Sequence, residues 1–250
     1  MNLEELLAYT SSDLLDDGTT LLDGESDSLY SDASLVALFN EAQRILARRA
    51  WCIIEYGVPP AGVIVLSAGK VLYPLHKSVL RIFDATPSTQ TAPLGRTSDI
   101  NLRNPYPPSA DAFDIGESAA IAGTTLNIPG AALAIATDAG TRMLRVAPEP
   151  AAAQANLRVD LKIARLPVTW LSLEDMEAEP EVPSDYHLAM CTYAAGKCLT
   201  RPQVDSNDKV TGREMLAEFD AIVREARRDR QRAEYNGDRW TFASTTAEIK

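Results

Sequence analysis

Hydrophobic residues recur at helical spacing in two stretches near the end of the chain. In the first, which opens with Pro183, one stripe is formed by Tyr186, Met190, Tyr193 and Lys197. The second stretch begins near Thr211, and its apolar face carries Met215, Leu216, Phe219, Ile222, Val223 and Ala226. Pro, Asn, Asp and Gly interrupt the pattern between the two stretches, in "RPQVDSNDKVTG". The pattern therefore predicts a helical hairpin over residues 183–236.

A third amphipathic helix is predicted near the beginning of the chain, over residues 31–54, after a short helix in "LEELLAYT". Ser31 or Asp32 is suited to cap it. Its buried stripe is formed by Leu35, Leu38, Phe39, Ala42, Ile45 and Leu46. Because a helical hairpin needs a partner to cover its joint apolar seam, we expect this helix to meet the hairpin in one core.

Between these helices the pattern changes to short apolar runs separated by Gly, Pro, Asn and Asp. In the run 157–164, Leu157, Val159, Leu161 and Ile163 alternate with more polar residues, as in a strand with one buried face. The runs predict a small antiparallel sandwich, interrupted by a proline-rich stretch at 91–113.

The predicted fold is therefore α+β, with a helical core and an inserted antiparallel β module of short strands. The N-terminal helix and the C-terminal helical hairpin form the core. We place the helical domain in two parts, at 1–60 and 173–236, with the β module between them at 61–172. An extended C-terminal tail follows at 237–250.

Composition limits the class of protein. The 250 residues carry a formal net charge of −11, which disfavours nonspecific DNA binding by the whole surface. No apolar run is long enough to span a bilayer, and the acidic N-terminus lacks the features of a signal peptide, so no membrane partner is expected. The odd number of cysteines, three, argues for a reducing compartment and against a disulfide framework.

No catalytic, metal or cofactor site is expected. His187, Cys191 and Cys198 could share one helix face, but helix-interior packing explains them better than a metal does. Ser184, Asp185 and His187 have the residue types of a hydrolase triad. They lie within one helical turn and point in different directions, so they cannot converge on one substrate atom. We therefore expect no enzyme activity.

Arginines are concentrated near the end of the last helix, at positions 224, 227, 228, 230 and 232. They could simply stabilise a helix C-terminus, contact an acidic partner such as a second copy of this chain, or contact DNA. We expect protein contacts, carried by Arg227, Arg228 and Arg230. In the polar tail that follows, Trp240 and Phe242 are spaced to lie on one face of an extended strand and are expected to anchor it to a partner.

Several segments, taken in order, resemble the head-to-tail adaptor (connector) proteins of tailed bacteriophages. They are "YSDASLVALFNEAQRILARRA", "YPLHKSVLRIFDA", "RLPVTWLSLEDMEAEPEVPSDYHLAMCTYAAGKCL" and a helix ending in "REARRDRQR". The resemblance covers roughly residues 31–232. It implies a ring, usually of twelve copies, beneath the portal protein of the capsid, made in the host cytoplasm and assembled into the virion at the head–tail junction.

The same resemblance implies that the ring offers a platform to a tail or nozzle protein, and that its C-terminal segment, here 237–250, reaches the portal. DNA would pass through the ring without specific binding, which the acidic balance favours. The alternatives are a tail-tube or tail-completion protein, a small phage enzyme and a monomeric binding module. The mass and shape of the assembly formed alone and with portal would distinguish them.

Overall fold

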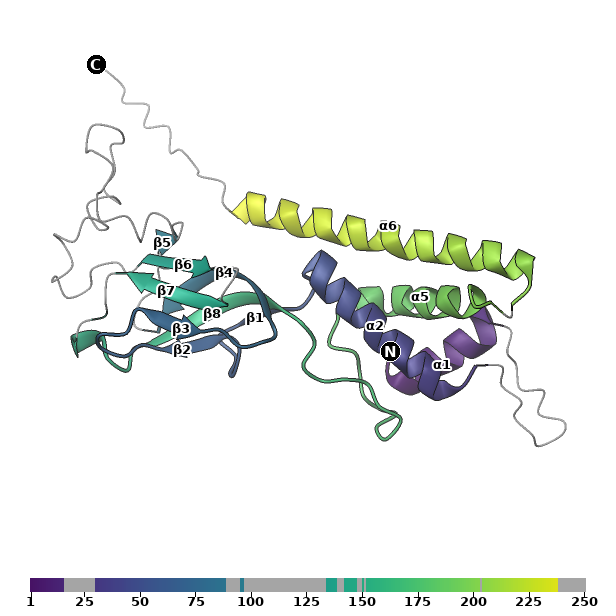
Figure 1. Cartoon of the computed structure of the whole chain (residues 1–250), viewed down its shortest axis with the longest axis horizontal. Coiled ribbons are helices and arrows are strands. Elements are labelled where there is room, and N and C mark those ends of the chain that lie inside the picture. Colours follow the sequence, from purple (N-terminus) through teal and green to yellow (C-terminus); the bar gives the residue numbers. More distant parts are fainter. Residues whose placement is uncertain are drawn as a thin grey trace, which may run out of the picture. The chain divides into compact units, whose positions relative to one another are not determined.

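The structure is a computed structural model. It describes residues 1–15, 30–88, 95–96, 134–138, 142–147, 150, 152–202 and 204–237. The chain divides into two compact units, a helical unit of Met1–Cys52 with Thr169–Lys250 and a β unit of Ile53–Val168 (Figure 1). Helices from both ends of the chain and small sheets between them confirm the predicted α+β class.

Capping residues define where the N-terminal helices begin. Asn2 and Glu5 form a reciprocal capping box on α1 (Leu3–Tyr9), which continues as a π-helical turn over Thr10–Leu14. The Ser31 side chain caps α2 (Asp32–Ala50), as predicted. Our expectation that this helix extends to residue 53 or 54 is wrong. Trp51 adopts a left-handed conformation, with φ of 55°, and ends the helix there.

The C-terminal hairpin consists of α5 (His187–Leu199) and α6 (Ser206–Gly237). A short 3-10 turn over Ser184–Tyr186 precedes α5, with Pro183 at its cap position. Our expected start of the second helix near Thr211 is wrong, because Gly212 does not break the helix. A Cβ atom on Gly212 would lie 3.0 Å from the Gly196 carbonyl oxygen and 2.9 Å from Leu199 Cβ. Gly212 therefore allows close approach of α5 and α6.

The core of the helical unit forms where α2 packs against both α5 and α6. Phe39 of α2 and Phe219 of α6 are both buried there, as predicted. The rings of Tyr193 and Phe219 are tilted against each other, with centroids 4.7 Å apart. Met190 is fully buried, and α1 adds Leu3 and Leu6 to the buried residues of this unit.

The acidic segment that leads into α5 is held against α2 by hydrogen bonds. The Asn40 side chain forms two hydrogen bonds of 2.9 Å with the backbone of Leu171, one to its N–H and one to its carbonyl oxygen. Gln43 Oε1 accepts a hydrogen bond from the Glu181 backbone N–H at 2.6 Å. Polar side chains on α2 thus fix the path of the returning chain.

The described residues of the β unit form two four-stranded sheets. In the first, β8 (Arg158–Arg165) pairs with β1 (Ile54–Tyr56) and β2 (Val63–Val65) on one edge and with β4 (Val79–Pro87) on the other. The second has the order β3 (Leu72–Pro74), β7 (Met143–Ala147), β6 (Ala134–Asp138) and β5 (Gly95–Arg96). A short 3-10 helix, Ala152–Gln154, precedes β8.

The two sheets share one hydrophobic core, in which Ile64, Leu161 and Ile163 of the first sheet join Tyr73 and Leu144 of the second. The predicted alternation in β8 is confirmed, with Val159, Leu161 and Ile163 buried. One pairing differs from the all-antiparallel expectation, since β5 pairs with β6 in parallel. Most of the proline-rich stretch at 91–113 lies outside the described residues.

We predict that Phe219→Ala will lower the free energy of unfolding by about 3–5 kcal/mol, because it removes a buried ring and leaves a cavity. Val210→Ala on the same helix is the control, since Val210 is half exposed and its loss should cost below about 1 kcal/mol. Denaturant titration measures both. A loss under about 1 kcal/mol for Phe219→Ala would contradict the packing described above.

A second prediction concerns the close approach of α5 and α6. Gly212→Ala should destabilise the protein by about 1–3 kcal/mol through overpacking, despite the helix propensity that alanine adds. Thr211→Ala is the matched control, because Thr211 is exposed and alanine there should be neutral or slightly stabilising. Thermal melts that rank Gly212→Ala above wild type would show that the helices can separate at this point.

Candidate partner-binding surface

The five arginines near the end of α6 lie on two sides of the helix. Arg224, Arg228 and Arg232 are spaced four residues apart and are exposed. Arg227 and Arg230 are half-buried. Our sequence-based choice of Arg227, Arg228 and Arg230 therefore combines residues from both sides.

The half-buried arginines, Arg227 and Arg230, interact with other residues of the helical unit. The Arg227 guanidinium lies over the ring of Trp51, the residue that ends α2, in a cation–π contact. Arg230 lies close enough to Tyr186 to act on its hydroxyl. Burial raises the pKa of Tyr186, and the positive charge of Arg230 opposes this shift. Arg227 in particular links the C-terminal half of α6 to the end of α2.

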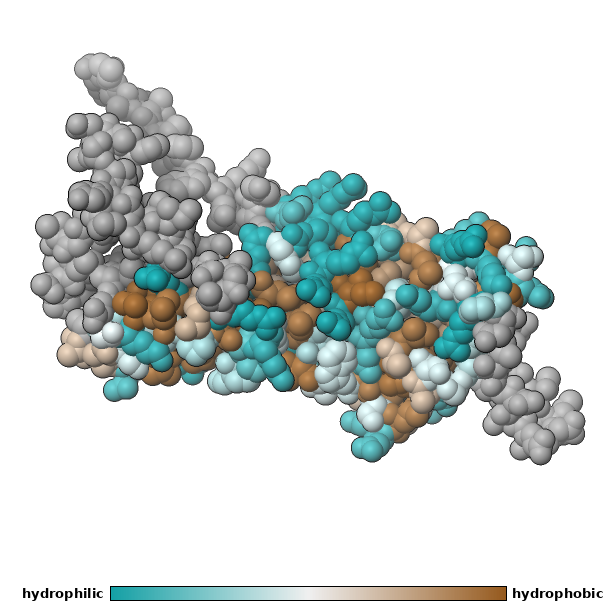
Figure 2. All heavy atoms as spheres, viewed as in Figure 1, coloured by the Kyte–Doolittle hydropathy of each residue, from teal (hydrophilic) through white to brown (hydrophobic). Residues whose placement is uncertain are grey.

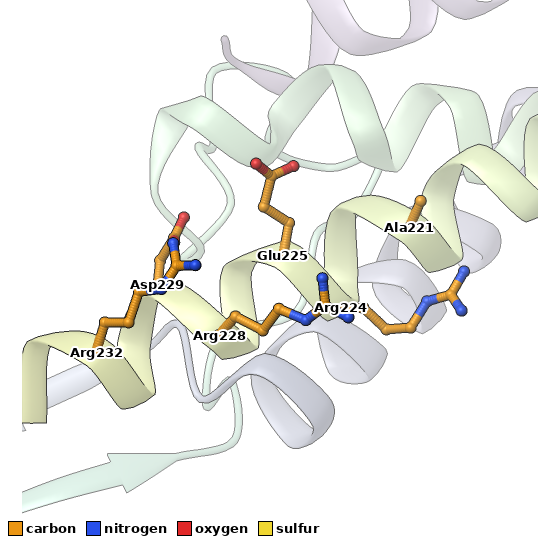
Figure 3. A pocket seen from close by; sticks show the side chains of 6 residues that line it. All are labelled: Ala221, Arg224, Glu225, Arg228, Asp229 and Arg232. Carbon is orange, nitrogen blue, oxygen red and sulfur yellow. The ribbon is translucent and has the colours of Figure 1, made fainter. Parts of the chain in front are cut away.

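The outer arginines line a shallow groove along α6 with a volume of about 420 Å³ (Figure 3). We call this surface the α6 stripe; its residues are Ala221, Arg224, Glu225, Arg228, Asp229 and Arg232. All six belong to one helix, so the groove is an open face and not an enclosed ligand cavity. Arg224 Nε donates to the Asp220 carbonyl oxygen at 3.1 Å. Arg232 Nη1 lies 3.4 Å from Asp229 Oδ1. Arg228 forms no hydrogen bond or ion pair with the described part of the chain.

Trp240 and Phe242, the predicted anchors of the tail, lie outside the described residues. Their role therefore stays a prediction.

Of the residues considered for metal binding and hydrolysis, His187, Cys191 and Cys198 are buried, whereas Ser184 and Asp185 are exposed. His187 is buried, and its Nε2 lies 3.0 Å from the Val182 carbonyl oxygen, to which it can only donate. Its Nδ1 lies 3.1 Å from the amino group of Met1. Cys191 is also buried, and burial raises the pKa of its thiol to about 11. Within the described ranges no three His, Cys, Asp or Glu side chains form a metal-binding cluster.

A second surface cavity, of about 530 Å³, lies beside the turn between α5 and α6. It is lined by Leu15, Tyr30, Leu199, Arg201, Val204, Asp205 and Asp208. Arg201 lies over the Tyr30 ring. Among the described residues, the side chains that line this cavity include no cysteine, serine or histidine. No helix among the described residues is both long and apolar enough to cross a membrane.

The environment of His187 predicts a pH dependence of stability. Burial lowers the pKa of His187 in the folded state, whereas an unfolded histidine titrates near about 6.5. As the pH falls below that value, the unfolded state takes up the proton more readily, so the free energy of unfolding should decrease. Denaturant titrations at pH 7 and pH 5 should show a larger decrease for wild type than for His187→Gln. Equal decreases in the two proteins would contradict the assignment.

Comparison with known proteins identifies the family. The model of the SU10 adaptor protein family matches residues 1–243, which include both the helical and the β unit. A search of curated proteins found no match. The match agrees with the resemblance found in the sequence. The chain therefore belongs to the SU10 adaptor protein family and is a phage head-to-tail adaptor, a structural protein and not an enzyme.

Proposed function

We propose that this adaptor forms a ring beneath the portal protein, joins the capsid to the tail and lines the channel through which DNA passes. The family match over residues 1–243 carries this proposal, because it includes every described helix and strand. The ring would contain twelve copies and present a platform to a tail or nozzle protein. It would be made in the host cytoplasm and act in the virion at the head–tail junction.

The charge of the chain supports a channel role. A net charge of −11 repels phosphate, so DNA could move past the ring without binding to it. A ring also requires two different contact surfaces on each subunit, since a head-to-tail interface is heterologous. The helical unit offers such a surface on α6, whose 32 residues span about 48 Å.

Contacts with portal or with a neighbouring subunit are assigned to Trp240 and Phe242 in the tail and to Arg227, Arg228 and Arg230 on α6. Aromatic and arginine side chains dominate the binding energy of many protein interfaces. Residues 237–250 have too few apolar groups to fold alone, and ordering them costs about 1–2 kcal/mol per residue in backbone entropy. Contacts with a partner would offset this cost.

We predict that deleting residues 237–250 will leave the melting temperature of the subunit almost unchanged and abolish portal binding. Trp240→Ala alone should weaken binding by at least about 2 kcal/mol if it is a hot spot, whereas Glu248→Ala in the same tail is the matched control. Co-sedimentation with purified portal and electron microscopy of the complex measure the outcome. A truncated protein that still docks normally would refute the role of the tail, and stacked tubes in place of a ring on the portal would indicate a tail-tube protein.

A further inference from the structure

Beyond the α6 stripe, the helical unit has a second charged surface of opposite sign. It is the segment that returns from the β unit toward α5, which we call the acidic loop; its exposed residues include Trp170, Leu173, Glu174, Asp175, Glu177 and Glu179. Trp170 is 51% exposed and Leu173 is 43% exposed. Glu174, Asp175 and Glu177 form no salt bridge with the described part of the chain. Along this segment, four carboxylates thus follow two exposed apolar side chains.

The acidic loop has a fixed shape. The Leu3 N–H donates to the Ala178 carbonyl oxygen at 2.9 Å, and the Glu4 N–H donates to the Met176 carbonyl oxygen at 3.1 Å. A turn within the loop is closed by the Asp175 N–H, which donates to the Ser172 carbonyl oxygen at 3.0 Å. Because this backbone is already ordered, binding through the loop would lose little conformational entropy.

The α6 stripe, by contrast, carries closely spaced positive charges that repel one another. Arg224 and Arg228, like Arg228 and Arg232, are like-charged pairs four residues apart, a spacing that destabilises a helix by a few tenths of a kcal/mol per pair. Figure 3 shows these arginine side chains extending along the stripe, and Figure 2 shows a mostly hydrophilic surface over α6. Carboxylates inserted among the guanidinium groups would relieve the repulsion. The small side chain of Ala221 leaves room beside them for a large apolar group.

The two surfaces lie on different sides of the helical unit. The acidic loop is bonded to α1 and to Asn40 and Gln43 of α2, whereas α6 packs on α5 and α2. In Figure 1 the loop between β8 and α5 lies across the helical unit from α6. The loop of one copy can therefore meet the stripe of another while its own stripe stays available. Such a contact is heterologous and repeats from subunit to subunit.

We infer that the acidic loop of one copy binds the α6 stripe of the next copy, with Trp170 against Ala221 and the loop carboxylates among Arg224, Arg228 and Arg232. This inference rests on the proposed ring. Duplex DNA would also bring negative charge to the arginines, but it offers no apolar side chain to the space beside Ala221. A second copy brings both the opposite charge and an exposed aromatic anchor.

Charge exchange in the full-length chain tests the inference. The stripe variant carries Arg224→Glu, Arg228→Glu and Arg232→Glu, and the loop variant carries Glu174→Lys, Asp175→Lys and Glu177→Lys. Each variant alone should self-associate at least about tenfold more weakly than wild type in analytical ultracentrifugation. Mixing the two variants should restore association, and so should combining all six changes in one chain, because opposite charges then face each other again.

Two further variants make the test specific. Trp170→Ala should weaken association without any change in charge. Lys70→Glu, Lys77→Glu and Lys162→Glu together produce the same change in net charge as the stripe variant, but on exposed residues of the β unit. This control should associate like wild type. Circular dichroism melts establish that each variant is folded, and restored association of the mixed variants shows the same independently.

The possible outcomes distinguish a failure of the loop–stripe contact from a failure of the proposed ring. A wild-type protein that stays monomeric alone and with portal would refute the proposed ring. A wild-type ring that both reversed variants form equally well would leave the ring in place and overturn the loop–stripe contact. Weakened variants that neither mixing nor combination restores would also overturn it. Duplex DNA binding that falls with rising salt and is lost in the stripe variant would show that the stripe binds DNA instead.

Discussion

The packing of α2 against α5 and α6 is the interaction on which the rest of the helical unit depends. It joins segments that the whole β unit separates along the chain, and its centre is formed by Phe39 and Phe219, which are both almost completely buried. Closing such a long connection has an entropic cost, and burial of large apolar side chains offsets it. Once this core forms, both the acidic loop and α6 are fixed to the same body.

Two kinds of contact make that packing specific. Gly196 and Gly212 let the backbones of α5 and α6 approach closely, which brings Tyr193 onto Phe219. Polar side chains on α2 then bind the returning chain through its backbone, as Asn40 does at Leu171. Because the apolar side of α6 is used inside the unit, its charged side remains available for other molecules. The helical unit thus combines a packed core with a charged face along α6.

Periodicity alone predicted most of the fold. The stripes containing Phe39 and Phe219 identified the helices that meet, and the alternation around Leu161 identified the strand β8. The errors had two causes. Gly212 was taken for a helix breaker, but it serves close helix packing. Trp51 ends α2 although no glycine or proline marks that point. Strand β1 was missed because this end of α2 is not marked in the sequence, and β1 begins a few residues later.

The candidate site was less predictable. The excess of arginine near the end of the chain was visible in the sequence, and helical spacing could have separated Arg224, Arg228 and Arg232 from Arg227 and Arg230. No local pattern shows that Trp51 lies beneath Arg227, because that contact depends on the tertiary packing of two distant helices. The fixed acidic loop was equally hidden, since its order depends on long-range backbone hydrogen bonds to α1.

Native-state hydrogen exchange tests most directly whether the two ends of the chain form one cooperative unit. If they do, the slowest amides around Phe39 in α2 and around Phe219 in α6 should exchange through one opening, with the same free energy and the same dependence on denaturant. Exchange of the α2 amides at a much lower free energy, while the α5–α6 hairpin remains protected, would contradict this prediction.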